Sequence, residues 1–158
     1  MLRTLMLISM LANGGTQLAA QHPIDRSTLV GQWDCNGRQG RGTAIRTLQE
    51  YRSNGHFYHL ANLAIGDKRG RLDSAVALRG SWKMENGTII EKVQTARMRS
   101  LSMNNQDISK SALGRRMAKS LPRRMTGPNK LSRTKVQFVS AREMKIVSGR
   151  IRGSCTKR

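Results

Sequence analysis

Hydrophobic and polar residues alternate along most of this chain, which is the pattern of half-buried β-strands. The clearest run spans residues 73–84, where one face carries Val76, Leu78, Gly80, Trp82 and Met84. Shorter alternating runs occupy residues 29–36, 43–52, 56–64, 88–98, 131–139, 144–147 and 150–155. Turn signals such as Ser53-Asn54-Gly55 and Glu85-Asn86-Gly87 separate them. The pattern therefore predicts seven or eight short strands, most of them joined in consecutive hairpins.

The pattern changes between about residues 104 and 130, where we predict one short, basic helical insertion. Asp107 is placed to cap the helix, and Pro122 is placed to end it. The apolar stripe of this helix consists of Ile108, Ala112, Met117 and Leu121. Its other face carries Lys110, Arg115, Arg116 and Lys119.

Residues 1–20 have the layout of a secretory signal peptide. Arg3 precedes an apolar run, and small residues follow it up to Ala19 and Ala20. The apolar run is too short to span a bilayer, and no second such run follows. We therefore expect cleavage near Ala20, a single domain over residues 21–158 without a transmembrane segment, and a secreted or periplasmic protein.

The two cysteines lie in the first and last predicted strands. In an oxidising compartment an even number of cysteines indicates a disulfide, here with one possible connectivity, Cys35 to Cys155. The alternation places Cys35 on the face of Trp33 and Cys155 on the face of Ile151. Two separately buried thiols are the alternative.

These features together predict an all-β fold, an up-and-down antiparallel barrel of about seven or eight strands with one short helical insertion. Closure of the barrel would also remove the exposed edges of the first and last strands. A two-sheet β-sandwich is the alternative that the same alternation permits.

Charge divides the chain unequally. The formal net charge is +20 at pH 7. Residues 21–91 carry ten Lys and Arg against seven Asp and Glu, whereas residues 92–158 carry eighteen against two. The second half is therefore strongly cationic, which bears on solubility and anionic partners rather than on fold.

Gly31-Gln32-Trp33, in the first strand of an exported single-domain meander, resembles the lipocalin and wider calycin pattern. The resemblance implies an arginine from the end of the barrel over the tryptophan, with Arg150 or Arg152 as candidates, although the alternation points both outward. Gly-x-Trp-x-Cys at the front and Cys-Thr-Lys-Arg at the end are also similar to small exported bacterial proteins of unassigned function, and this second likeness implies a fold but no activity.

The barrel interior is the first candidate functional region. The residues predicted to face it are Trp33, Val76, Leu78, Trp82, Met84, Phe138, Met144 and Ile146. A barrel of this size is either filled by such side chains or encloses a cavity. A cavity would make the protein a binding module for a small hydrophobic or amphipathic ligand, with the insertion over one end.

The outer face of the basic half is the second candidate. The residues predicted to bind a polyanion are Arg133, Lys135, Lys145, Arg150, Arg152, Arg115, Arg116 and Lys119. Export points to anionic lipid headgroups or acidic glycans. Nucleic acid is not expected, because six aromatic residues provide no stacking platform. The alternative is a solvated cationic surface without a specific partner.

The sequence shows no catalytic constellation, and we expect no enzyme activity, cofactor or metal. His56 and His59 point to opposite faces of a strand and do not form a metal pair, so a position at the surface or the barrel mouth is expected. Glu50 is predicted to face outward. The face of Glu91 is ambiguous, because Ile89 and Ile90 are adjacent and cannot both point inward.

Overall fold

A computed structural model describes residues 25–40, 42–67, 70–127 and 129–158, so the predicted signal peptide lies outside the described residues. The first described element is a short helix, α1 (Arg26–Leu29), capped by Asp25. Leu29, expected in the first strand, therefore ends this helix instead. The strands are β1 (Gly31–Gln39), β2 (Thr43–Tyr51), β3 (His56–Asp67), β4 (Gly70–Glu85), β5 (Thr88–Met103), β6 (Gln106–Asp107), β7 (Leu131–Ser140), β8 (Glu143–Ser148) and β9 (Ile151–Lys157).

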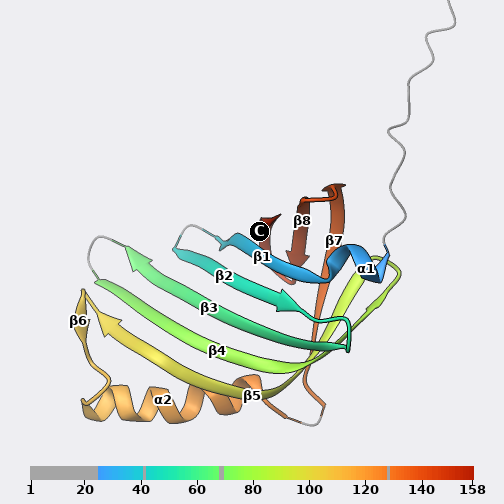
Figure 1. Ribbon diagram of the computed structural model, residues 1–158. Helices are drawn as coiled ribbons and strands as arrows, with labels where there is room; N and C mark the ends of the chain where they lie inside the picture. The colour runs from blue at the N-terminus through green and yellow to red at the C-terminus, as the bar shows by residue number, and fades with distance from the viewer. Residues whose placement is uncertain (1–24, 41, 68–69, 128) are drawn as a thin grey trace, which may run out of the picture.

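Eight of these strands form a closed antiparallel barrel (Figure 1). The order around the barrel is β4-β3-β2-β1-β9-β8-β7-β5, and the pairing of β4 with β5 completes the ring. The two-residue β6 only extends the end of β5. The predicted all-β, up-and-down barrel is therefore confirmed, and the sandwich alternative is wrong, because each of the eight strands is paired on both sides.

The first and last strands are neighbours, and a disulfide joins them. Cys35 and Cys155 lie directly opposite each other in the β1–β9 register, with their Cα atoms 4.0 Å apart. Both residues are buried, and they are 120 residues apart in sequence. The predicted pairing is confirmed.

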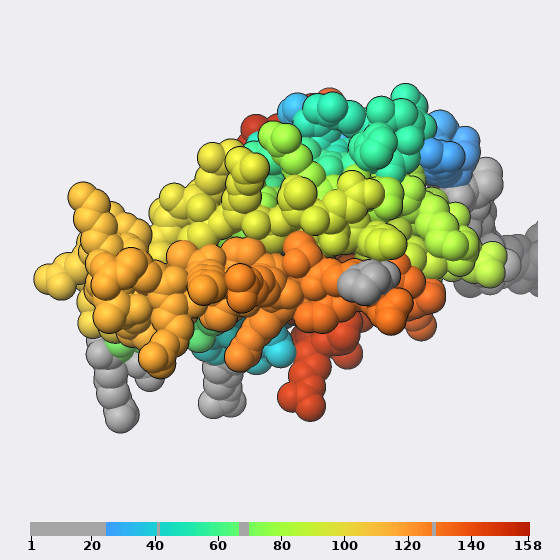
Figure 2. Space-filling model, turned by 90° about the horizontal axis from the view of Figure 1, so that it is seen from below, coloured from blue at the N-terminus to red at the C-terminus, as the bar shows by residue number. Residues whose placement is uncertain are grey.

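Helix α2 (Ala112–Met125) packs against β5. In that strand only residues 88–92 pair with β7, so the helix lies beside the part of β5 that β7 leaves free. Figure 2 shows α2 in orange along β5 in yellow. A helix in this position shields a strand edge that would otherwise expose unpaired backbone groups. Within the described residues, no helix has the length and apolarity needed to cross a membrane.

Two details of the predicted helix were wrong. Its N-cap is Ser111, whose hydroxyl accepts a hydrogen bond from the Gly114 amide, whereas Asp107 accepts one from the Ser109 amide in the preceding turn. Pro122 lies inside the last turn, and the helix continues to Met125. The proline lacks only one backbone donor there, and the Thr126 amide still reaches the Pro122 carbonyl.

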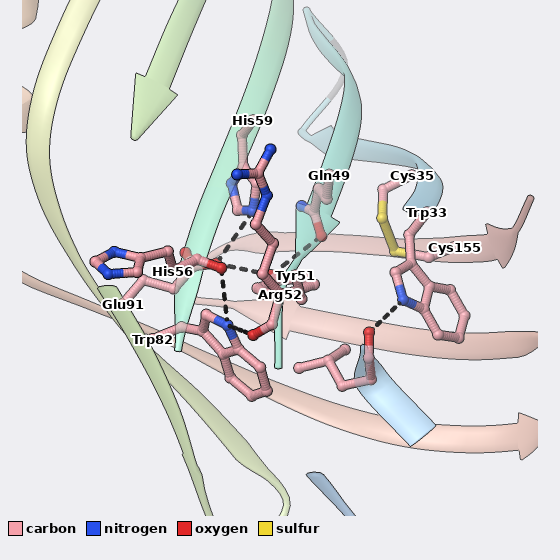
Figure 3. Close-up of polar contacts among 11 residues, drawn as sticks. Trp33, Cys35, Gln49, Tyr51, Arg52, His56, His59, Trp82, Glu91 and Cys155 are labelled. Carbon is pink, nitrogen blue, oxygen red and sulfur yellow. Dashed lines mark hydrogen bonds and ion pairs between the residues drawn. A yellow bond between two sulfur atoms is a disulfide. The ribbon is translucent and has the colours of Figure 1, made fainter. Parts of the chain in front are cut away.

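Two tryptophans fill the end of the barrel next to α1. The indole of Trp33 donates to the carbonyl of Leu29 at 2.8 Å, and Trp33 is fully buried. The indole of Trp82 donates to the carbonyls of Arg52 and His56, both at 3.1 Å (Figure 3). Because each buried N–H has an acceptor, these large rings can fill the barrel end without an unsatisfied polar group.

Lys157 is the basic residue that covers Trp33. Its ammonium nitrogen lies 5.4 Å from the ring centroid and donates to the carbonyl of Thr28 at 2.9 Å. The stem of Lys157 passes over Gly31, where a Cβ atom would lie 2.8 Å from the lysine Cε. Gly31 also has a φ of 129°, which side-chain-bearing residues rarely adopt. Both residues of the Gly-x-Trp motif therefore contribute to the contact with Lys157: Gly31 leaves room for its stem, and Trp33 packs under its ammonium group.

This contact corrects the expectation that Arg150 or Arg152 covers the tryptophan. Arg150 lies in the turn between β8 and β9, and Arg152 is exposed opposite Arg38 on the outer face. Lys157 is two residues from Cys155 and therefore shares its face, and it pairs directly with Trp33 in the β1–β9 register.

The structure places the predicted interior residues as follows. The buried ones are Trp33, Val76, Trp82 and Met144. Partly buried and packed against the core are Leu78, Met84, Phe138 and Ile146. Of the adjacent isoleucines, Ile89 belongs to the core cluster, and Ile90 is buried outside that cluster.

We expect the double variant Cys35→Ser/Cys155→Ser to fold with lower stability. Opening a cross-link over 120 residues restores chain entropy to the unfolded state, which on the loop-entropy account costs up to about 4–5 kcal/mol. Urea denaturation of the oxidised protein and of the variant measures the loss. Equal midpoints would contradict the view that this bond holds β1 against β9.

Candidate functional site

The interior of the barrel holds a cavity of about 690 Å³ that is open to solvent. Much of its wall is apolar, built from inward-facing residues of six strands that include Ile45, Ala61, Leu78, Ile89, Val93, Ile146 and Ile151. Asn129 and Lys130, which precede β7, also line the cavity, and these exposed residues mark its opening to solvent. Of α2, Met125 lines the cavity, while the body of the helix packs along β5 rather than over one end. The barrel is therefore not filled by its side chains.

A cluster of polar side chains interrupts the apolar wall, and we call Tyr51, His59 and Glu91 the polar trio. The Tyr51 hydroxyl donates to Glu91 Oε1 at 2.7 Å, and it also lies 3.2 Å from Gln49 Oε1. His59 Nε2 is 3.5 Å from the same Glu91 oxygen (Figure 3). All three residues are buried and line the cavity. The trio is thus a buried polar cluster in a chamber whose wall also carries the hydroxyls of Thr47, Ser132, Thr134 and Ser148.

Strand register brings the trio together from three strands. His59 on β3 pairs with Gln49 on β2, and Tyr51 follows Gln49 by two residues on the same face. Glu91 on β5 pairs with Trp82 on β4, which is also an inward position. The trio therefore spans β2 to β5, with β4 between His59 and Glu91.

Gly80 makes room between these strands. It lies on β4 opposite Phe57, at a register shift in the β4–β5 pairing. A Cβ atom there would come within 2.0 Å of the Lys92 carbonyl oxygen and 2.9 Å of the Phe57 ring. The glycine thus lets β5 and the Phe57 ring approach β4 closely beside the trio.

Aromatic packing holds the trio in place. The Tyr51 ring lies edge-on to Trp82 and to His59, with centroid distances of 5.3 and 5.2 Å. The Phe57 ring also packs against His59, with the ring centroids 4.4 Å apart. These contacts restrict the tyrosine and histidine rings, so the polar atoms point to fixed positions.

Burial controls the protonation of the trio. It raises the pKa of Glu91 to about 7, although the hydrogen bond from Tyr51 partly opposes this rise. Burial lowers the pKa of His59 to about 3, and with the nearby Glu91 it raises the pKa of Tyr51 well above its ordinary value. At neutral pH the histidine is therefore uncharged, so its contact with Glu91 is not an ion pair. The only member that titrates near pH 7 is Glu91.

His59 Nε2 has no hydrogen-bond partner within the part of the chain that the structure describes. A buried polar nitrogen without a partner costs about 1–3 kcal/mol. Together with a buried carboxyl, it makes this wall of the cavity ready to hydrogen-bond a polar group on a bound molecule.

Sequence reasoning missed this trio. It expected both histidines at the surface or the barrel mouth, which is wrong for His59 and correct for the exposed His56. The inward direction of Glu91 could have been found from the strand register that the hairpin turn at residues 85–88 sets. With Glu85 paired to Thr88, counting back through the register places Glu91 opposite Trp82, which was already assigned inward.

The basic residues predicted to bind a polyanion are all exposed. On the outward faces of three adjacent strands, β7 to β9, lie Arg133, Lys135, Lys145 and Arg152. Arg150 lies in the turn between β8 and β9. The others, Arg115, Arg116 and Lys119, lie on α2, beside β5. Because β5 and β7 are paired, the helix and the three strands belong to one side of the barrel.

Comparison with known proteins assigns no family to the chain. The sequence matches no protein-family model and no curated protein. What the structure shows is a closed eight-stranded barrel with the Lys157 ammonium over the tryptophan of Gly31-Gln32-Trp33.

Glu91 is expected to make stability depend on pH. Its pKa is about 7 in the folded protein and near 4.5 when exposed. The stabilisation that protonated Glu91 gives the folded state is therefore complete below pH 4.5. As the pH rises through 7 it is lost, and the free energy of unfolding falls by about 3 kcal/mol. The lowered pKa of His59 acts in the opposite direction between pH 6.5 and 3. Glu91→Gln removes only the first effect.

The measurement is urea denaturation of Glu91→Gln and the unmodified protein at pH 4.5 and 7. Between pH 4.5 and 7 the unmodified protein should lose about 3 kcal/mol of unfolding free energy relative to Glu91→Gln. A difference that stays constant with pH would show that Glu91 titrates normally.

Proposed function

We propose that this chain is an exported, lipocalin-like binding protein that holds a small apolar or amphipathic ligand in the barrel. The observation that carries the proposal is the cavity of about 690 Å³, lined largely by apolar side chains with one polar cluster. This volume is within the range of small-molecule sites, and a mostly apolar chamber with a few fixed polar groups is their usual composition.

The architecture supports such a function. One end of the barrel is filled by Trp33 and Trp82, while the cavity opens beside Asn129 and Lys130. The disulfide and the closed ring of strands favour a cavity that exists before the ligand arrives. Export agrees with the signal-peptide pattern of residues 1–20 and with an oxidised cysteine pair. We propose binding rather than catalysis.

Native mass spectrometry of protein exported through residues 1–20 and purified without denaturation tests the proposal. We expect a chain beginning near residue 21, two hydrogens lighter for the disulfide, and a discrete additional mass that leaves on unfolding. Ala61→Phe, which fills the cavity, should remove the additional mass. The matched control Ala141→Phe, in the exposed turn before β8, should retain it. An unliganded mass for the unmodified protein, with Ala61→Phe equally stable, would contradict a carrier.

The arrangement of basic side chains favours a second function, binding of an anionic envelope surface. The exposed residues of α2 and of β7 to β9 lie on one side of the barrel, and Figure 2 shows α2 at the molecular surface. After Glu91 the described chain has two acidic residues, Asp107 and Glu143, and Glu85 lies near Arg133, which helps to lower its pKa. Such a predominantly basic surface attracts anionic lipid headgroups or acidic glycans.

Binding to vesicles that contain phosphatidylglycerol tests this second function. We expect the triple change Arg133→Gln, Lys135→Gln and Lys145→Gln to weaken binding on the order of 100-fold at low salt, because each basic residue near the surface contributes attraction. The control is Arg52→Gln, Arg71→Gln and Arg79→Gln, which removes equal charge from another part of the barrel. Equal loss in both variants, or binding unchanged by 0.5 M salt, would count against a specific basic face.

A further inference from the structure

Glu91 is the one buried carboxyl in the described part of the chain. Its position is unusual for this protein, in which 29 lysines and arginines accompany nine acidic residues. Several carboxylates on the barrel surface have basic partners: for example, Asp34 pairs with Arg46 and Asp73 pairs with Arg71. The buried Glu91 has no such partner among the described residues, because its contacts are a phenol and an uncharged imidazole.

A carboxylate buried without a cation is unfavourable, since neither water nor an opposite charge compensates it. The titratable or charged groups around Glu91 do not supply that charge. Tyr51 from β2 stays protonated, and His59 from β3 stays neutral. The residues that pair with Glu91 in the sheet, Trp82 on β4 and Ser132 on β7, do not titrate. The remaining charged residue of the wall, Lys130, is exposed at the cavity opening.

This wall offers a cation three acceptors. They are the carboxylate of Glu91, the side-chain oxygen of Gln49 and, in the tautomer that carries its proton on Nδ1, Nε2 of His59. A fatty-acid carboxylate placed here would meet another carboxyl without an arginine or lysine beside it. An ammonium group brings three N–H donors and a positive charge, so it satisfies these acceptors and neutralises Glu91.

We propose that the ligand of this cavity is an amphipathic amine, whose protonated amino group binds the polar trio while its apolar part lies along the aliphatic wall. The inference rests on the proposed carrier function and names the chemical class of its ligand. Ionised Glu91 is the group that would select an amine over an alcohol or a fatty acid of the same chain length.

The test is isothermal titration of the exported protein with dodecylamine, 1-dodecanol and dodecanoate. It is carried out at pH 8, below the micelle concentration, in 0.3 M NaCl to suppress binding to the basic surface. We expect dodecylamine to bind most tightly. In Glu91→Gln its affinity should fall about 30-fold or more, whereas that of 1-dodecanol should change little, because only the amine loses a charged partner. The matched control Glu50→Gln, an outward carboxyl paired with Arg52, should leave both affinities unchanged.

The pH dependence gives a second readout. Below pH 7 the amine must displace the proton of Glu91, so its affinity should fall about tenfold per pH unit, while the affinity for 1-dodecanol stays level. If 1-dodecanol or dodecanoate binds as tightly as dodecylamine, and Glu91→Gln has no selective effect, the amine inference is overturned and the carrier function stands. If none of the three binds and no ligand copurifies, both are overturned.

Discussion

The structure depends on the pairing of β1 with β9. Without it, the other strands would form an open sheet with two unpaired edges, and no cavity would be enclosed. Three features converge on this pairing: the Cys35–Cys155 bond, the contact of Lys157 with Trp33, and the absence of a side chain at Gly31. Because Lys157 and Cys155 face the same way, one strand supplies both the covalent link and the cover over the tryptophan.

The interior combines two demands that normally conflict. A barrel core is most stable when apolar and densely packed, yet this one retains a chamber with a buried carboxyl and a histidine nitrogen without a partner. The aromatic residues around Tyr51 and His59 meet both requirements, because they pack densely while the polar trio beside them faces the cavity. Stability is thus concentrated at the filled end, which leaves the rest of the interior free for a ligand.

The even number of cysteines and the expected export predicted the disulfide. Period-two alternation, together with the turn signals, predicted the strands and the barrel, because these depend on which residues share a face. It failed where a second constraint decided the outcome. The adjacent Ile89 and Ile90 hid the inward direction of Glu91, which only the register set by the hairpin turn reveals. The Gly-x-Trp resemblance implied an arginine over Trp33, but position relative to Cys155 selects Lys157. The cavity could not be predicted, since alternation identifies inward residues without saying whether they meet.

The closure of the ring also has a consequence for the order in which the chain folds. All but two of the pairings in the ring connect strands joined by a short turn, so they can form locally and quickly. The β5–β7 pairing must wait for the intervening helix, and β1 finds its second neighbour only when a segment 120 residues away becomes free to fold. Until β9 pairs with it, β1 therefore remains an exposed edge. In that interval the half-formed sheet is open to aggregation and to chaperones.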